Sequence, residues 1–149
     1  MARLPTDFGG MLGVKQSKEV GMRPSTVEYL EGLAQVPDED LGIRSMEALR
    51  ALGHDQAEVV LEDLSEFLRQ SLNTKAQIVM RVITKVPHSS YYFTLTTLLS
   101  RPSEREQVIT RCKGDILRVA FLPESRQGTI AHVSGILGFM VQCYRAFNS

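Results

Sequence analysis

The sequence predicts an all-α fold of about seven helices, stacked as antiparallel helical hairpins. Apolar residues recur at three- and four-residue spacing through most of the chain, and prolines, glycines and capping residues divide the pattern into segments. The predicted helices begin near residues 26, 39, 55, 74, 90, 103 and 125, so every second start is separated by about 29 to 35 residues. This spacing is typical of helical-hairpin repeats. It predicts a HEAT- or armadillo-like solenoid fragment or a compact bundle.

The first 24 residues are rich in glycine and show no periodic apolar face. We therefore predict a flexible N-terminal arm over residues 1–24, followed by a single helical domain over residues 25–149. Ser25 and Glu28 have the spacing of a capping box, which predicts that the first helix begins there. Pro37 ends it.

Two helices are predicted in the acidic segment that follows. Asp38 can start the first, which ends at Gly53, and Asp55 can cap the second. The second has the clearest amphipathic pattern in the chain, because its glutamates lie opposite the apolar face. That face comprises Ala57, Val60, Leu61, Leu64, Phe67 and Leu68.

Residues 72–100 predict two helices joined at Pro87. Asn73 can cap the first, and Pro87 ends it because proline has no backbone N–H and disfavours helical backbone in the preceding residue. Ser89 or Ser90 can cap the second. A strand over residues 91–99 is the alternative, because aromatic residues and threonines favour sheets. The absence of strand alternation and turn signals favours the helix.

The last two predicted helices differ in character. Ser103 and Glu106 form a second capping-box pattern, and this amphipathic helix ends before Pro123. The final helix, from about residue 124 to residue 147, is apolar on more than one face. Its small residues would let another helix approach closely: Gly128, Ala131, Gly135 and Gly138.

A helix of this kind either occupies the centre of a bundle or packs on a partner, and a homo-oligomer could form through it. The candidate interface residues are Ile136, Phe139, Met140 and Tyr144. Its uninterrupted apolar run is too short to span a bilayer, so we predict a soluble protein without a membrane partner.

The net charge is zero, but the charges are unevenly distributed. Residues 38–66 carry nine acids, whereas residues 69–118 carry nine bases. If the helices beginning near residues 74 and 103 are equivalent members of successive repeats, they lie side by side and form a basic stripe. That stripe could bind RNA phosphates or an acidic peptide, and Tyr91 could stack on a base. Its residues are Arg81, Lys85, Arg111 and Arg118. The alternative is that these bases pair with the acidic helix or face water.

No catalytic constellation, metal site or cofactor motif is predicted. Cys112 lies in an apolar stripe and is expected to be buried, and neither it nor Cys143 has metal-type spacing to a histidine. Two distant cysteines are typical of a reduced, intracellular protein, either nuclear or cytoplasmic. We assign His54, His88 and His132 to surface or capping roles.

Several short segments, taken in order, carry a family resemblance over residues 55–143. They are Leu-Ser-Glu-Phe-Leu ending at residue 68, Asn-Thr-Lys at 73–75, the break at Pro87, and Tyr-Phe-Thr-Leu-Thr-Thr-Leu-Leu at 92–99. This order resembles the first helical repeats of the middle domain of the initiation factor four G type. It is most similar to that domain of the large subunit of the nuclear cap-binding complex. The resemblance implies a scaffold for RNA-processing partners, and it identifies no residue that reads a cap.

From these features we predict a non-enzymatic helical-repeat scaffold or interaction domain in RNA metabolism. It would bind a protein partner or RNA through its basic helical face. The alternative is a small helical regulatory or viral factor that self-associates through its apolar C-terminal helix.

Overall fold

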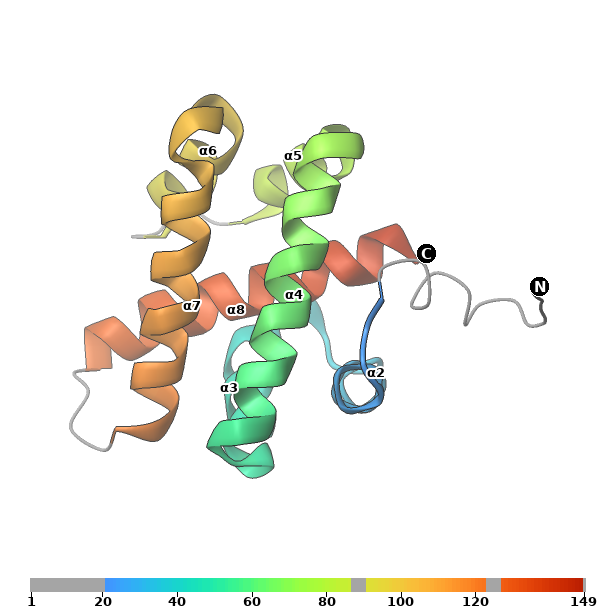
Figure 1. Cartoon of the computed structure of the whole chain (residues 1–149), viewed down its shortest axis with the longest axis vertical. Coiled ribbons are helices and arrows are strands. Elements are labelled where there is room, and N and C mark those ends of the chain that lie inside the picture. Colours follow the sequence, from blue (N-terminus) through green and yellow to red (C-terminus); the bar gives the residue numbers. More distant parts are fainter. Residues whose placement is uncertain (1–20, 87–90, 123–126, 149) are drawn as a thin grey trace.

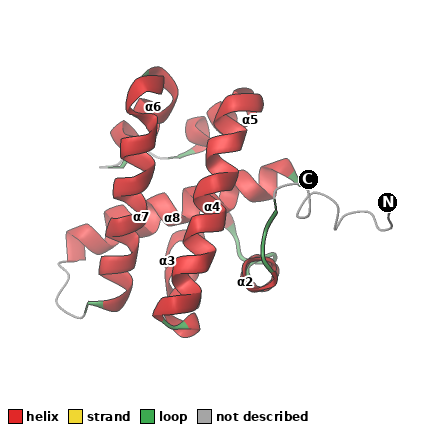
Figure 2. Ribbon diagram, in the orientation of Figure 1, coloured by secondary structure: helices red, strands yellow, loops and turns green. Residues whose placement is uncertain are grey.

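The computed structural model describes residues 21–86, 91–122 and 127–148, with side chains from residue 130 in the last range (Figure 1). All regular structure in these ranges is helical, as Figure 2 shows, so the all-α prediction is confirmed and residues 92–100 form a helix rather than a strand. The elements are α2 (Pro24–Gly32), η2 (Asp38–Asp40), α3 (Leu41–Leu52), α4 (His54–Thr74), α5 (Ala76–Lys85), α6 (Tyr92–Ser100), η3 (Pro102–Glu104), α7 (Arg105–Phe121) and α8 (Gln127–Phe147).

Helix α8 lies at the centre of the arrangement. It packs against α3 most extensively and also against α4, α5 and α7, and in Figure 1 it crosses behind α4 and α7. Because these helices surround α8, the structure shows the central one of the two positions predicted for the last helix. None of the described helices combines the length and apolar character needed to cross a bilayer. The choice between a solenoid fragment and a bundle stays a prediction.

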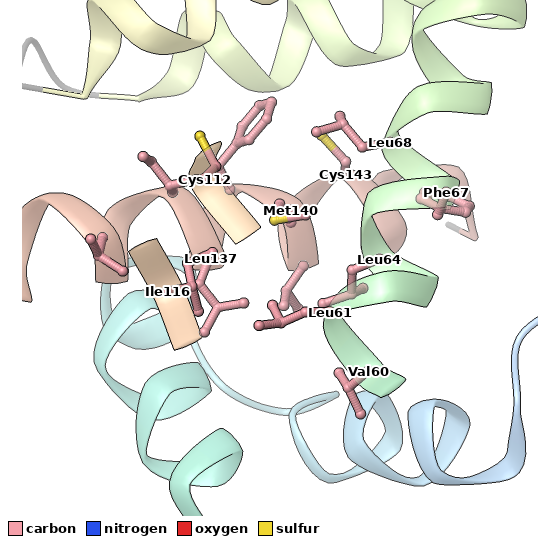
Figure 3. Close-up of a cluster of buried hydrophobic side chains, with 14 of the residues drawn as sticks. Val60, Leu61, Leu64, Phe67, Leu68, Cys112, Ile116, Leu137, Met140 and Cys143 are labelled. Atoms are coloured by element: carbon pink, nitrogen blue, oxygen red, sulfur yellow. The ribbon is translucent and has the colours of Figure 1, made fainter. Parts of the chain in front are cut away.

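The centre of the core lies where α4, α7 and α8 meet. Leu61 and Leu64 of α4 meet Ile116 of α7, and Leu137 of α8 completes the cluster (Figure 3). Each of these four side chains is almost completely buried. The apolar spacing predicted this face of α4 correctly, because residues three and four apart lie on one side of a helix.

Helices α3 and α5 end where the sequence predicted, because a glycine or a proline fixes the backbone conformation at those positions. Gly53 has a φ of +86°, a conformation that other residues rarely adopt, and it separates α3 from α4. Val86 is extended, as expected for a residue that precedes a proline, and α5 ends at Lys85. Ser89 and Ser90, the predicted caps of α6, lie outside the described residues.

The other predicted caps are wrong. Helix α2 begins at Pro24 rather than at Ser25, because proline is favoured in the first helical turn. Helix α4 begins at His54, continues through Asn73 and ends at Thr74, so Asn73 caps nothing. The capping box at Ser103 does not form either. A short 3₁₀ turn precedes α7 there, and the Glu106 side chain pairs with a different helix.

A charged cluster attaches the start of α2 to α4. Asp63 accepts hydrogen bonds from the Arg23 backbone N–H at 3.0 Å, from the Arg23 guanidinium at 2.6 Å and from the Thr26 hydroxyl at 2.6 Å. Burial alone would raise the pKa of Asp63, but the hydrogen bonds from Arg23 and Thr26 hold it below its usual value. Arg23, predicted to belong to the arm, is thus part of the folded domain, whereas residues 1–20 of that arm lie outside the described residues.

Two arginines donate hydrogen bonds to backbone carbonyls at a helix end and in a loop. Arg105 Nε donates to the Leu98 carbonyl at 2.8 Å, and Arg145 Nη1 donates to the Val36 carbonyl at 2.7 Å. These carbonyls lie near chain turns, where helical partners are missing. Arg69 of α4 pairs with Glu106 of α7. Part of the charge asymmetry therefore stabilises the fold.

Candidate interaction groove

The N-terminus of α3 lies directly on α8 at a contact between glycines. A Cβ atom on Gly138 would lie 2.9 Å from the Gly42 Cα atom, and a Cβ on Gly42 would lie 2.9 Å from the Ser134 carbonyl oxygen. Side chains at these positions would collide with backbone, so the two helices approach this closely only because both residues are glycine. The predicted close approach of another helix is confirmed at Gly138.

The same small-residue face of α8 forms the floor of an open groove, which we call the α8 groove. It has a volume of about 850 Å³. One wall comes from η2 and the start of α3, and the other from the end of α5 and from Tyr91. The lining residues are Asp38, Glu39, Leu41, Gly42, Ile43, Lys85, Val86, Tyr91, Ile130, Ala131, Ser134, Gly135, Gly138 and Gln142.

Tyr91 shapes its wall of the groove. A Cβ atom on Gly135 would overlap the Tyr91 ring, so the ring lies against the bare backbone of α8. The ring also contacts His132 edge to face, with 6.3 Å between ring centroids. Tyr91 was predicted as a stacking platform for a base. The structure places it, half-buried, against the groove floor instead.

Five polar side chains give the groove its chemical character. The Glu39 carboxylate and the Lys85 ammonium are exposed on opposite walls, and neither forms an ion pair with another described residue. Asp38, by contrast, is paired with Arg145 at 3.3 Å. The Gln142 amide lies on the floor. Ser134 is only 6 % exposed and also lies on the floor.

An exposed apolar side chain borders the groove. Ile43 is 64 % exposed although it lies on the first turn of α3, next to the buried Leu41. Phe93 of α6 is exposed to a similar degree but does not line the groove. Isolated exposed apolar residues are common on protein surfaces, whereas one at the rim of an apolar groove extends a continuous apolar surface.

The predicted basic stripe does not form as expected. Arg81, Lys85, Arg111 and Arg118 are all exposed, but α5 and α7 are not among the helix pairs that pack closely. Both helices pack instead on α4, α6 and α8, so they are not adjacent members of a stack. Arg118 also donates to Asp115 of its own helix at 2.9 Å. Of the four bases, only Lys85 lines the groove.

The predicted interface on α8 lies largely inside the protein. Ile136, Phe139 and Met140 are at most 4 % exposed, because α3, α4, α5 and α7 surround α8. Tyr144 is partly buried, with its ring against that of Phe67 at a centroid distance of 5.4 Å. These residues complete the domain's own core, so the prediction that they form an exposed self-association surface is wrong.

Both cysteines are buried, as the position of Cys112 predicted. Burial raises the pKa of the Cys112 thiol to about 11, and it also raises the pKa of Cys143 well above the ordinary value. The two thiols are therefore protonated at neutral pH and shielded from reagents. This environment is the opposite of the one that activates a nucleophilic cysteine.

One cluster that the sequence analysis missed lies at the start of α4. Potential ligand atoms of His54, Asp55 and Glu58 lie within 4.8 Å of one another, and all three residues are exposed. The signal was the four-residue spacing of His54 and Glu58, which places both on one helical face. The N-terminal end of a helix carries partial positive charge, which opposes a cation there. We therefore assign no metal to this cluster.

Comparisons of the chain with protein-family models, with curated proteins and with solved structures yield no match. The resemblance to the middle-domain repeats of the initiation factor four G type accordingly stays a prediction.

Proposed function

We propose that the chain is a non-enzymatic interaction module that binds a segment of a partner protein in the α8 groove. The observation that carries the proposal is the groove itself. It is an open cavity of about 850 Å³ whose floor is the small-residue face of the central helix. A concave, mainly apolar site with a few polar groups is the usual form of a binding site.

The energetic support comes from apolar surface that an occupant would remove from water. Ile43 at the rim is 64 % exposed, and fully burying such a side chain contributes about 1.5–3 kcal/mol. Val86 and Ile130, both half-buried, add apolar lining that still faces water. A few well-buried apolar contacts of this kind carry most of the affinity in typical protein interfaces.

RNA binding through the basic helices is the competing function, in keeping with the scaffold role that the resemblance implies. Arg81 and Arg111 are exposed and form no ion pair with another described residue. They lie on helices that do not pack closely together, so they supply no single continuous stripe. The groove gathers its lining residues into one concave site, so we prefer it, and RNA binding becomes an alternative outcome of the test below.

The test is a selection of random peptides of about 16 residues, roughly four helical turns, against the purified chain. Two variants alter the groove without touching the core: Ala131→Trp fills it, and Ile43→Asp charges its rim. Phe93→Asp is the matched control, because it makes an equally exposed apolar residue acidic outside the groove. We expect the selected peptides to bind the wild-type chain and Phe93→Asp equally, and to bind both groove variants at least about tenfold more weakly.

Failure to select peptides, or equal binding to all four proteins, would overturn the proposal. Labelled single-stranded RNA is measured in parallel at low and high salt. RNA binding that falls steeply with salt and disappears in an Arg81→Glu, Arg111→Glu double variant, with no peptide binding, would assign the function to the basic helices instead.

A further inference from the structure

Resting on this proposed function, we infer that Arg145 is a positioning residue for the α8 groove. It lies in the last turn of α8, three residues beyond Gln142, and it is not one of the lining residues. Its guanidinium holds the η2 part of one wall in place. Removing it should therefore weaken binding in the groove without removing a side chain that lines the site.

The η2 turn has little packing of its own. None of its three residues is buried, although the turn supplies part of one groove wall. A backbone hydrogen bond from the Asp40 N–H to the Pro37 carbonyl, at 3.0 Å, closes the turn. The nearest buried side chains along the chain are Val36 before it and Leu41 after it. The turn thus spans the gap between two anchored residues, and a contact from another helix is needed to fix it.

Arg145 supplies that contact. Its Nη1 donates to the Val36 carbonyl at 2.7 Å and to the Leu33 carbonyl at 3.4 Å, and its Nη2 lies 3.3 Å from a carboxylate oxygen of Asp38. A guanidinium is planar and carries several donors in a fixed arrangement, so one side chain can bind all three groups. Hydrogen bonds from a charged donor are also stronger than those between neutral groups.

Fixing Asp38 also fixes the residue that follows it. The Glu39 carboxylate is exposed on the groove wall and has no ion-pair partner among the described residues, so it is available to an occupant. A wall that is already ordered loses little conformational freedom on binding, which raises affinity. Without Arg145 the turn would sample several positions, and ordering it again on binding would lower affinity.

Arg50 provides the matched control for a purely structural role. Its Nε donates to the Ala120 carbonyl at 3.2 Å, so it too joins one helix to a backbone carbonyl of another element. It lies in the last turn of α3 and is not among the lining residues. Arg50→Gln and Arg145→Gln remove the same kind of contact, so both should lower stability. Only Arg145→Gln should alter the groove.

The first measurement needs no ligand. Hydrogen exchange of the Asp40 amide, followed by NMR in the full chain, reports how firmly the turn is held. Exchange should be at least about tenfold faster in Arg145→Gln than in the wild-type chain, and unchanged in Arg50→Gln. Arg145→Lys keeps the charge but not the planar fork, so its rate should be intermediate. Equal rates in all four proteins would overturn the inference.

The second measurement uses the peptides selected above. They should bind Arg145→Gln at least about fivefold more weakly than the wild-type chain, Arg145→Lys with intermediate affinity, and Arg50→Gln as tightly as the wild-type chain. Circular dichroism checks that each variant is folded.

Peptides that bind Arg145→Gln and the wild-type chain equally, yet lose affinity for Ile43→Asp, would overturn this inference and leave the proposed function intact. Equal weakening by Arg145→Gln and Arg50→Gln would reduce Arg145 to a structural residue and also overturn it. If no peptides are selected, the proposed function fails and this inference fails with it, whatever the exchange rates are.

Discussion

Replacing Gly138 by alanine tests the close contact between α3 and α8. In an open helix this change stabilises, since alanine has a helix propensity about 1 kcal/mol better than that of glycine. Here the new Cβ would lie 2.9 Å from both the Cα and the N of Gly42. These are backbone atoms that cannot rotate away, so α3 and α8 must move apart. Overpacking of this kind costs about 1–3 kcal/mol.

We therefore expect Gly138→Ala to lower the free energy of unfolding by up to about 2 kcal/mol net, measured by urea denaturation with circular dichroism. In a chain of this size the midpoint temperature should fall by up to about 8 °C. Gly114→Ala on α7 is the control, because nothing lies within 4 Å of its Cβ position. It should raise stability by about 0.5–1 kcal/mol. If both variants are stabilised, the close contact between α3 and α8 is not what the structure indicates.

Three further predictions concern the core, the charged cluster and the thiols. Leu64→Ala should lower the free energy of unfolding, measured by urea denaturation, by about 2–5 kcal/mol. Glu58→Ala, on the exposed face of the same helix, should lower it by less than about 0.5 kcal/mol. Equal effects would contradict the assigned helix face. The folded-state pKa of Asp63 is depressed, so its stabilisation is complete above the unfolded value of about 4 and is lost as pH falls through the folded value. Asp63→Asn should lower stability at pH 7 by about 1.5–3 kcal/mol and flatten the acid side of the stability–pH curve; an unchanged curve would refute this role. Cys112 and Cys143 should react with a thiol reagent only after unfolding, and rapid labelling of the native protein would contradict their burial.

Local chemistry explains why the helices themselves were predictable. The stop at Val86 requires only the following proline, and the break at Gly53 requires only a residue that tolerates positive φ. Caps were predicted less well, because they depend on competition between neighbours. Pro24 moves the start of α2, and Glu106 forms an ion pair with Arg69 instead of folding back on its own helix.

The candidate site was predictable only in part. Lys85 and Tyr91 were identified from the sequence and do line the groove, although for a different reason. The close approach to α8 was expected from its small residues. The segment that approaches it, the first turn of α3 at Gly42, could not be identified from the sequence. A glycine early in a helix indicates only a weakened first turn and not a contact with another helix.

By itself, then, the sequence determined the all-α class, the apolar face of α4 and the burial of residues such as Leu64 and Cys112. These follow from 3.6-residue periodicity, which is a property of one helix at a time. The tertiary structure alone decided which helices meet. Periodicity says that a face is buried but not against what, so α8 could equally have been an outer surface. Its central position buries Ile136 and leaves its glycine face to floor the groove. The same holds for ion pairs. Acidic residues are frequent along the sequence, and only the packing of the helices decides which of them lies beside a given arginine, as Glu106 lies beside Arg69.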